Sequence, residues 1–178
     1  MVVILMGVSG SGKTTVGRAL AQRLGWIFAD ADDFHSAENR AKMNAGIPLT
    51  DADRAPWLDA LHAQVSQWTA AEGVGAGGNA VLACSALKQQ YRERLTAGID
   101  PASIRMVWLD GTEELIAQRL QQRAGHYMSP ALLPSQMATL EPPAVALRVS
   151  IAQDVAAIVE AICAALAAGG YAGVKDCS

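Results

Sequence analysis

Short runs of apolar residues alternate along the chain with longer segments in which apolar side chains recur every three or four positions. The apolar runs lie at residues 2–6, 26–29, 80–84, 104–109 and 145–151. A continuous apolar run bounded by polar residues is typical of a strand that is buried on both faces, as in a parallel sheet. The pattern therefore predicts five parallel strands in one sheet.

The segments between these runs show the spacing of amphipathic helices. We expect helices at residues 13–24, 53–68, 87–95, 112–123 and 155–168, with irregular or broken helix between 125 and 140. Alternating strands and helices are typical of an α/β fold in which helices cover both faces of a parallel sheet. No internal repeat or long linker divides the chain, so residues 1–178 are predicted to form a single domain with a flexible tail at 169–178.

Composition excludes several classes of protein. Apolar residues make up 51% of the 178 positions and charged residues 17%, which is typical of a folded domain rather than a disordered chain. The net charge of −3 argues against a nucleic-acid-binding surface. The apolar stretch 155–168 is too short to span a membrane and includes Glu160. Cys84, Cys163 and Cys177 show neither metal-ligand spacing nor a disulfide framework, so we expect a cytoplasmic protein.

Residues 7–14 read GVSGSGKT and match the phosphate-loop pattern G-x-x-x-x-G-K-[ST] in full. Glycines let the backbone point successive N–H groups at phosphate oxygens, and the following helix adds its positive N-terminal end. In this pattern Lys13 reaches the β- and γ-phosphates of ATP and the Thr14 hydroxyl coordinates Mg²⁺. A chance glycine-rich turn is the alternative, but the strand before the motif and the helix after it favour nucleotide binding. The predicted nucleotide-binding residues of the loop are Gly7, Val8, Ser9, Gly10, Ser11, Gly12, Lys13, Thr14 and Thr15.

Polar and charged side chains follow the second and third predicted strands. They are Asp30, Asp32, Asp33 and His35 after the second strand, and Ser85, Lys88 and Arg92 after the third. Because ligands of an open parallel sheet gather beyond the carboxyl ends of its strands, we expect these groups to converge opposite the phosphate loop.

A phosphoryl-transfer site needs a carboxylate that orients the attacking hydroxyl group. We assign this catalytic role to Asp32, together with Lys13, and expect Asp30 to hold a water bound to Mg²⁺. The alternative for residues 30–33 is a solvated turn with helix-capping aspartates, which is the commoner role of such a string taken alone. Its position directly after the second strand of a phosphate-loop protein favours the catalytic interpretation.

Arg119 and Arg123 lie four residues apart and therefore on one face of the predicted helix 112–123. They can form a solvated basic face, or they can belong to a lid that closes arginine over the γ-phosphate. The polar, proline-bordered segment 125–140 favours the lid. We therefore predict a lid region at 119–140, with Arg119 and Arg123 binding nucleotide and Arg123 also catalytic.

Further motifs extend beyond the phosphate loop. They are Asp32-Asp33-Phe34-His35, Asn39-Arg40-x-Lys42-Met43-x-x-Gly46-Ile47-Pro48-Leu49, Asp51-x-Asp53-Arg54-x-Pro56-Trp57-Leu58, Cys84-Ser85-Ala86-Leu87-Lys88-x-x-Tyr91-Arg92, Arg123-x-Gly125-His126-Tyr127-Met128, Leu133-x-Ser135-Gln136 and Leu140-Glu141-x-Pro143. Together with residues 7–14, these motifs resemble the gluconate kinase (gluconokinase) family of small P-loop kinases. The strings at 51–58 and 84–92 are far more specific than the phosphate loop, which by itself indicates only a nucleotide.

The resemblance implies a nucleoside-monophosphate-kinase-like fold with an acceptor-binding helical region at about 34–72. It also implies ATP-dependent, Mg²⁺-assisted phosphorylation of the terminal hydroxyl group of D-gluconate to 6-phospho-D-gluconate, in the cytoplasm and by a homodimer. Neither a nucleic acid nor a membrane is an expected partner. Within that picture the acceptor would be bound by Asp32, His35, Arg54, Lys88 and Arg92.

Two other interpretations stay open at this point. A shikimate kinase or another small-molecule kinase of the same fold has a similar Asp-x-Asp after its second strand, although the 51–58 string does not belong to it. A non-catalytic nucleotide-binding module would need none of the acceptor-side groups. The resemblance is weaker at residues 144–150, which lack the polar pattern expected near adenine, and the glycine-rich loop at 73–79 is assigned no role.

Overall fold

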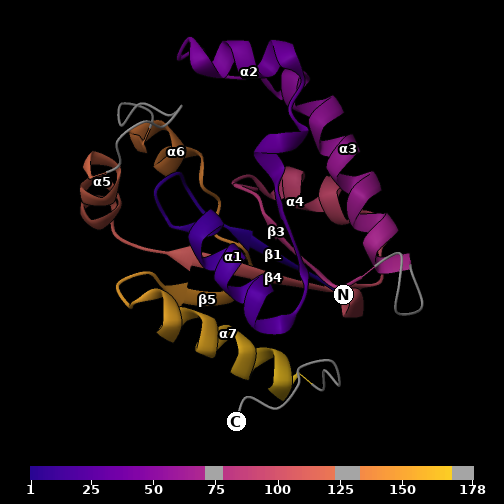
Figure 1. Ribbon diagram of the computed structural model, residues 1–178. Coiled ribbons are helices and arrows are strands. Elements are labelled where there is room, and N and C mark those ends of the chain that lie inside the picture. Colours follow the sequence, from indigo (N-terminus) through magenta and orange to yellow (C-terminus); the bar gives the residue numbers. More distant parts are fainter. Residues whose placement is uncertain (71–77, 123–132, 170–178) are drawn as a thin grey trace.

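The computed structural model describes residues 1–70, 78–122 and 133–169, and its strands form one parallel sheet (Figure 1). The strands are β1 (Val2–Met6), β2 (Ile27–Asp30), β3 (Ala80–Ala83), β4 (Ile104–Asp110) and β5 (Leu147–Ser150). They lie in the order β2-β3-β1-β4-β5, and every neighbouring pair is parallel. The predicted five-stranded parallel sheet is therefore confirmed.

Helices cover both faces of this sheet (Figure 1). They are α1 (Lys13–Leu24), α2 (Ala37–Asn44), α3 (Asp51–Ala70), α4 (Gln89–Thr96), α5 (Glu113–Gln121), α6 (Leu133–Thr139) and α7 (Val155–Ala168), with short 3₁₀ turns η1 (Ala31–Phe34) and η2 (Pro101–Ser103). Within the described ranges, none of these helices combines the length and the apolar character needed to cross a bilayer.

The central strand β1 contributes side chains to two separate hydrophobic cores, because successive side chains of a strand point to opposite faces. On one face Leu5 belongs to a buried cluster with Leu20 of α1 and Ile162 of α7. On the other face Ile4 shares a cluster with Leu61 of α3, and α4 joins the same cluster. Burial on both sides explains why this strand reads as an unbroken apolar run.

Most element boundaries fall within two residues of the predicted ones. The last strand is shorter than the predicted run 145–151, because Val145 is 88% exposed and lies outside the sheet. The segment 125–140, predicted as irregular or broken helix, contains α6 in its described part.

Helix α3 begins at Asp51, two residues earlier than predicted, because Thr50 and Asp53 form a reciprocal cap. The Thr50 hydroxyl oxygen accepts a hydrogen bond from the Asp53 N–H at 3.2 Å, and Asp53 Oδ2 accepts one from the Thr50 N–H at 2.9 Å. Pro56 lies inside the helix at a typical cost of about 3 kcal/mol. Burial of large side chains such as Leu61 offsets this cost, since each contributes about 1.5–3 kcal/mol.

Candidate active site

The phosphate loop connects β1 to α1 and lies beyond the carboxyl end of the central strand (Figure 1). Gly7 has a φ of +146°, and a Cβ there would lie 2.9 Å from the carbonyl oxygen of Leu109, so this close backbone approach requires glycine. The Lys13 ammonium donates hydrogen bonds to the carbonyl oxygens of Gly7 (2.9 Å) and Val8 (3.0 Å). These bonds keep the lysine charge at the loop.

The other loop residues divide into buried and accessible groups. Ser11 is fully buried, and its hydroxyl oxygen has no hydrogen-bond partner among the described residues. A Cβ on Gly10 would lie 2.8 Å from Cγ of Leu120, so α5 rests on the loop at this point. Thr15 is exposed in the first turn of α1. The loop is therefore held between the core and α5, and Thr15 just after it is open to solvent.

Thr14 and Asp30 bring two kinds of oxygen ligand together beside the loop. The Thr14 hydroxyl donates a hydrogen bond to Asp30 Oδ2 at 2.8 Å, and Asp30 Oδ1 accepts one from the Asp32 N–H at 3.2 Å. Mg²⁺ at nucleotide sites takes most of its oxygens from phosphates and water and only one or two from protein. The described residues contain no cluster of three His, Cys, Asp or Glu side chains that could hold a metal alone. The Thr14–Asp30 pair fits a Mg²⁺ ion bound mainly by nucleotide and water.

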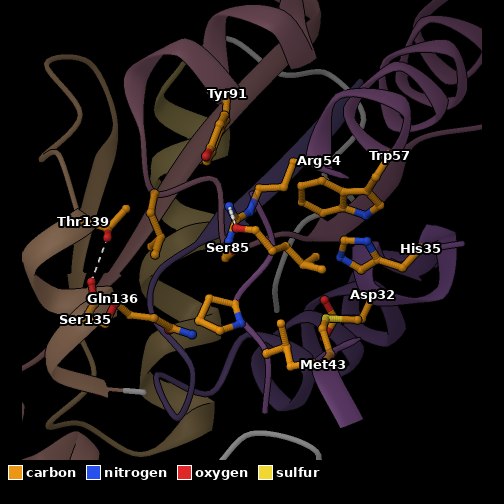
Figure 2. Close-up of a pocket in the computed structure, with 14 residues that line it drawn as sticks. Asp32, His35, Met43, Arg54, Trp57, Ser85, Tyr91, Ser135, Gln136 and Thr139 are labelled. Atoms are coloured by element: carbon orange, nitrogen blue, oxygen red, sulfur yellow. Dashed lines mark hydrogen bonds between the residues drawn. The ribbon is translucent and has the colours of Figure 1, made fainter. Parts of the chain in front are cut away.

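A pocket lies beside the phosphate loop, between the α2–α3 segment, the loop after β3 and helix α6 (Figure 2). Its wall combines apolar side chains with a few polar groups, which is usual for a small-molecule site. It is lined by Asp32, His35, Met43, Ile47, Pro48, Leu49, Arg54, Trp57, Ser85, Leu87, Tyr91, Ser135, Gln136 and Thr139. Three of the predicted acceptor residues, Asp32, His35 and Arg54, therefore meet at one pocket.

Asp32 lies in η1, directly after β2, and lines the pocket (Figure 2). Asp32 is solvent-exposed, and the protein atoms around its carboxyl group desolvate it in part. This desolvation raises the pKa of Asp32, the charge of Asp30 raises it further, and Lys13 lowers it. A carboxylate with a raised pKa is a stronger base once ionised, so the position and basicity of Asp32 suit proton acceptance from a hydroxyl group.

The rings of His35 and Trp57 stack with their centroids 4.5 Å apart and their planes 10° from parallel (Figure 2). Trp57 is itself held in place, because its indole N–H donates a 2.7 Å hydrogen bond to the carbonyl oxygen of Ala31. Burial, followed by the positive charges of Arg54 and Arg40, lowers the pKa of His35 to about 4. His35 is therefore neutral near pH 7. Its Nδ1 lies 3.5 Å from the amide nitrogen of Asn39, which leaves Nε2 as the ring nitrogen for a ligand.

Arg54 and Lys88 both approach the carboxylate of Asp51. Lys88 Nζ lies 3.1 Å from Asp51 Oδ1, and Arg54 Nη1 lies 3.9 Å from the same atom. The hydroxyl group of Tyr91 also donates to Asp51, and this bond, followed by that from Lys88, lowers the pKa of Asp51. Arg54 in addition lines the pocket and donates to the carbonyl oxygen of Leu49. Of these two predicted acceptor residues, Arg54 is placed at the pocket and Lys88 in the ion pair.

Arg92 points into the protein and is only 8% exposed. Its Nη1 donates hydrogen bonds of 2.9 Å to the carbonyl oxygens of both Ala86 and Leu87. Ala86 has a φ of +41°, which residues other than glycine rarely adopt, so these bonds brace a strained turn. The turn carries Ser85 to the pocket. The sequence predicts a direct acceptor contact for Arg92, whereas the structure places its guanidinium on the loop that borders the pocket.

Arg119 lies on α5 close to the phosphate loop. Its Nη2 donates a hydrogen bond to the carbonyl oxygen of Ile151, and its Nη1 lies 3.8 Å from where a Cβ on Gly12 would be. Arg123, with the rest of 123–132 in the predicted lid region, lies outside the described residues. The described parts of the lid region, at the end of α5 and in α6, both touch the phosphate loop.

Helix α6 contributes pocket residues that the sequence analysis places only in the lid region, without individual roles. Ser135, Gln136 and Thr139 line the pocket, and Gln136 Oε1 also accepts a 2.7 Å hydrogen bond from the backbone N–H of Ser9. The available signal was the motif Leu133-x-Ser135-Gln136, which matched the family pattern without pointing to a function.

Known proteins resemble this chain over most of its length. A family model described as an AAA domain matches residues 2–143. The gluconokinase of Gluconobacter oxydans is 52% identical over 79% of this chain and 75% of its own length, and the thermosensitive gluconokinase of Escherichia coli is 44% identical over 88% and 82%. The crystal structure of a gluconokinase from Sinorhizobium meliloti superposes with a TM-score of 0.80 at 40% identity, over 93% of this chain and 91% of that one. On its motifs, its fold and this identity, the chain belongs to the gluconokinase family of P-loop kinases.

Proposed function

We propose that this kinase transfers the γ-phosphoryl group of ATP to the terminal hydroxyl group of D-gluconate and forms 6-phospho-D-gluconate. The observation that carries the proposal is that Asp32, His35 and Arg54 line one pocket beside the phosphate loop. Its relatives include gluconokinases, one of them 52% identical over the aligned residues, and this similarity supports gluconate as the acceptor.

On the nucleotide side, the N–H groups of the phosphate loop bind the β- and γ-phosphates. Lys13 exchanges its bonds to loop carbonyl groups for bonds to phosphate oxygens. Thr14 would hold Mg²⁺ directly and Asp30 would hold it through a water. When bound, the ion neutralises charge on the phosphates. Arg119 and Arg123 belong to a lid at 119–140 that excludes water from the transferring group.

On the acceptor side, each lining group matches one part of gluconate. The guanidinium of Arg54 suits the carboxylate, and the Nε2 atom of the neutral His35 ring suits a hydroxyl group, which can either donate or accept. Asp32 orients the terminal hydroxyl group and accepts its proton as the oxygen attacks phosphorus. Lys88 acts through Asp51 and Arg92 through the turn at Ala86, so both shape the pocket from its border.

The acceptor-binding helical region at about 34–72 supplies His35, Arg54 and the supporting Asp51.

The protein acts as a homodimer in the cytoplasm. Cys84 and Cys163 are buried thiols, which suits a reducing compartment. Light scattering coupled to gel filtration tests the dimer.

The test of the proposed function is ADP release with ATP and Mg²⁺ against a panel of D-gluconate, other sugar acids, shikimate and AMP. We expect D-gluconate to have the highest kcat/KM and ³¹P NMR to identify a 6-phosphate ester. Lys13→Ala should abolish turnover, since electrostatic stabilisation of this kind is worth about 3–4 kcal/mol. Faster turnover with shikimate, or ATP hydrolysis that ignores every acceptor, would contradict the proposal.

A further inference from the structure

Helix α6 and the phosphate loop are joined by a two-point contact between residues 127 positions apart. The Ser9 N–H donates a hydrogen bond to Gln136 Oε1 at 2.7 Å, and Gln136 Nε2 donates one to Ser9 Oγ at 3.3 Å. A backbone N–H can only donate, so the carboxamide must present its oxygen to it. Gln136 thus holds one of the phosphate-loop N–H groups.

The backbone N–H groups of such a loop are the donors that hold nucleotide phosphates. Hydrogen bonds to a charged phosphate oxygen are roughly twice as strong as those to a neutral amide oxygen. Gln136 reaches the Ser9 N–H from the acceptor pocket, and the transferring terminal phosphate must face that pocket. We therefore expect the terminal phosphate, rather than the β-phosphate, to displace the Gln136 carbonyl oxygen from Ser9. The displaced carboxamide faces a new neighbour of negative charge, which attracts its NH₂ group and repels its oxygen.

The same side chain lines the acceptor pocket, where Asp32 and His35 enter from the other wall (Figure 2). Its helix is anchored independently, because Leu133 is buried in the core and the Glu141 N–H, just after the helix, donates a 2.9 Å hydrogen bond to the carbonyl oxygen of Leu87. Gln136 can therefore turn without moving α6. The Gln136 carboxamide then lies at the border between the phosphate loop and the pocket. The transferring phosphoryl group must cross this border.

We propose that Gln136 is a positioning residue that couples binding of the ATP terminal phosphate to binding of the acceptor. Without that phosphate, the carboxamide oxygen is held by the Ser9 N–H. With it, the NH₂ group turns to the phosphate and the oxygen accepts a hydrogen bond from an acceptor hydroxyl group. The acceptor consequently binds more tightly after ATP than after ADP. This inference rests on the proposed function for the identity of the acceptor.

The test is calorimetric titration of D-gluconate into the Mg²⁺-containing protein, alone, with saturating ADP and with a saturating non-hydrolysable ATP analogue. For the parental protein we expect the Kd for gluconate to be about 5-fold or more lower with the analogue than with ADP, which is the usual size of such coupling. Gln136→Met keeps the length of the side chain but removes both polar atoms. It should bring this ratio to about 1 while changing the Kd of gluconate alone by less than about 2-fold.

Gln136→Glu should also lose the coupling and should bind the analogue more weakly than ADP, because its carboxylate repels the terminal phosphate. Ala138→Met, at an exposed position of the same helix that does not line the pocket, is the matched control and should keep the parental ratio. A parental ratio in Gln136→Met, or a parental protein without coupling, overturns the inference. A Gln136→Met variant that weakens gluconate binding equally in all three titrations also overturns it, since Gln136 would then only line the pocket.

Failure of the proposed function has a separate signature. A parental protein that neither binds nor phosphorylates gluconate overturns both the proposed function and the inference. Normal gluconate turnover by the parental protein, with coupling that survives in Gln136→Met, overturns the inference alone. Thermal unfolding of each variant shows whether a lost ratio follows from a lost fold.

Discussion

The Thr14 hydroxyl donates a 2.8 Å hydrogen bond to Asp30 Oδ2 and so joins the first turn of α1 to the last residue of β2. β2 is an edge strand, separated from the central β1 by β3. The bond therefore reaches across the carboxyl edge of the sheet and brings a carboxylate to the phosphate loop. It fixes the orientation of a hydroxyl group that the metal would use.

Asp30→Asn should raise the Mg²⁺ concentration needed for half-maximal turnover by about 10- to 100-fold, the usual effect of losing a group that orients a metal ligand. The amide keeps the size of the side chain but cannot attract the ion or its water. Steady-state rates over a Mg²⁺ series, at saturating ATP and gluconate, measure this shift. Asp33→Asn, at an exposed neighbouring position, is the control and should leave the Mg²⁺ dependence unchanged. If Asp30→Asn needs the same Mg²⁺ concentration for half-maximal turnover as the parental protein, Asp30 does not take part in metal binding.

Asp32→Asn should lower kcat by about 10²- to 10⁴-fold, because the amide cannot accept the proton of the acceptor hydroxyl group. ATP binding should change little, since the phosphate loop is intact. The control is again Asp33→Asn. Retention of more than about a tenth of the parental kcat would mean that Asp32 is not the base.

The pH profile gives a second test of Asp32. Desolvation raises its pKa and the charge of Asp30 raises it further, so the acid limb of kcat/KM should lie above the ordinary aspartate range. Removing that charge in Asp30→Asn lowers the pKa of Asp32, which moves the acid limb to lower pH. A limb that stays in place would assign the titration to another group.

His35 should make folding sensitive to acid. Its pKa is about 4 in the folded protein, against 6.5 for an ordinary histidine, so the unfolded chain binds more protons between these two values. Stability contributed by the neutral ring is complete above pH 6.5 and is lost as pH falls, by about 2 kcal/mol at pH 5. His35→Gln and His35→Phe cannot titrate and should both flatten this part of the profile. Urea unfolding from pH 7 to pH 5 measures it, and parallel profiles for all three proteins would refute the prediction.

Substitutions should show that Arg92 stabilises the fold and that Arg54 binds the acceptor. Arg92→Met leaves the Ala86 and Leu87 carbonyl groups without their charged donor and should lower the free energy of unfolding by about 1.5–3 kcal/mol. Arg54→Met should instead raise the KM for gluconate by about 10- to 100-fold, the equivalent of one charged hydrogen bond. Denaturant unfolding and gluconate kinetics of both variants distinguish the roles. An Arg92→Met variant of parental stability with a raised KM would restore direct acceptor binding by Arg92.

Local features of the sequence were sufficient to predict the strands, the helices and the phosphate loop. Residues 7–14 carry their own geometry, because glycine conformations and the start of α1 depend on neighbours in the chain. The apolar run at Val2–Met6 shows burial on both faces without reference to any partner strand. Placement of Asp32 after β2 then follows from the rule that parallel strands present their carboxyl ends at one edge.

The tertiary structure alone decided which side chains meet. Helical spacing puts Lys88 and Arg92 on one face of a helix, but only the fold turns Arg92 inward to the strained turn at Ala86 and turns Lys88 to Asp51. The contact of Ser9 with Gln136 joins residues 127 positions apart, and no local pattern encodes it. Periodicity reports whether a side chain is buried, because burial follows from one face of one element. The identity of its partner depends on how several elements are arranged around a common edge, and that arrangement is a property of the whole fold.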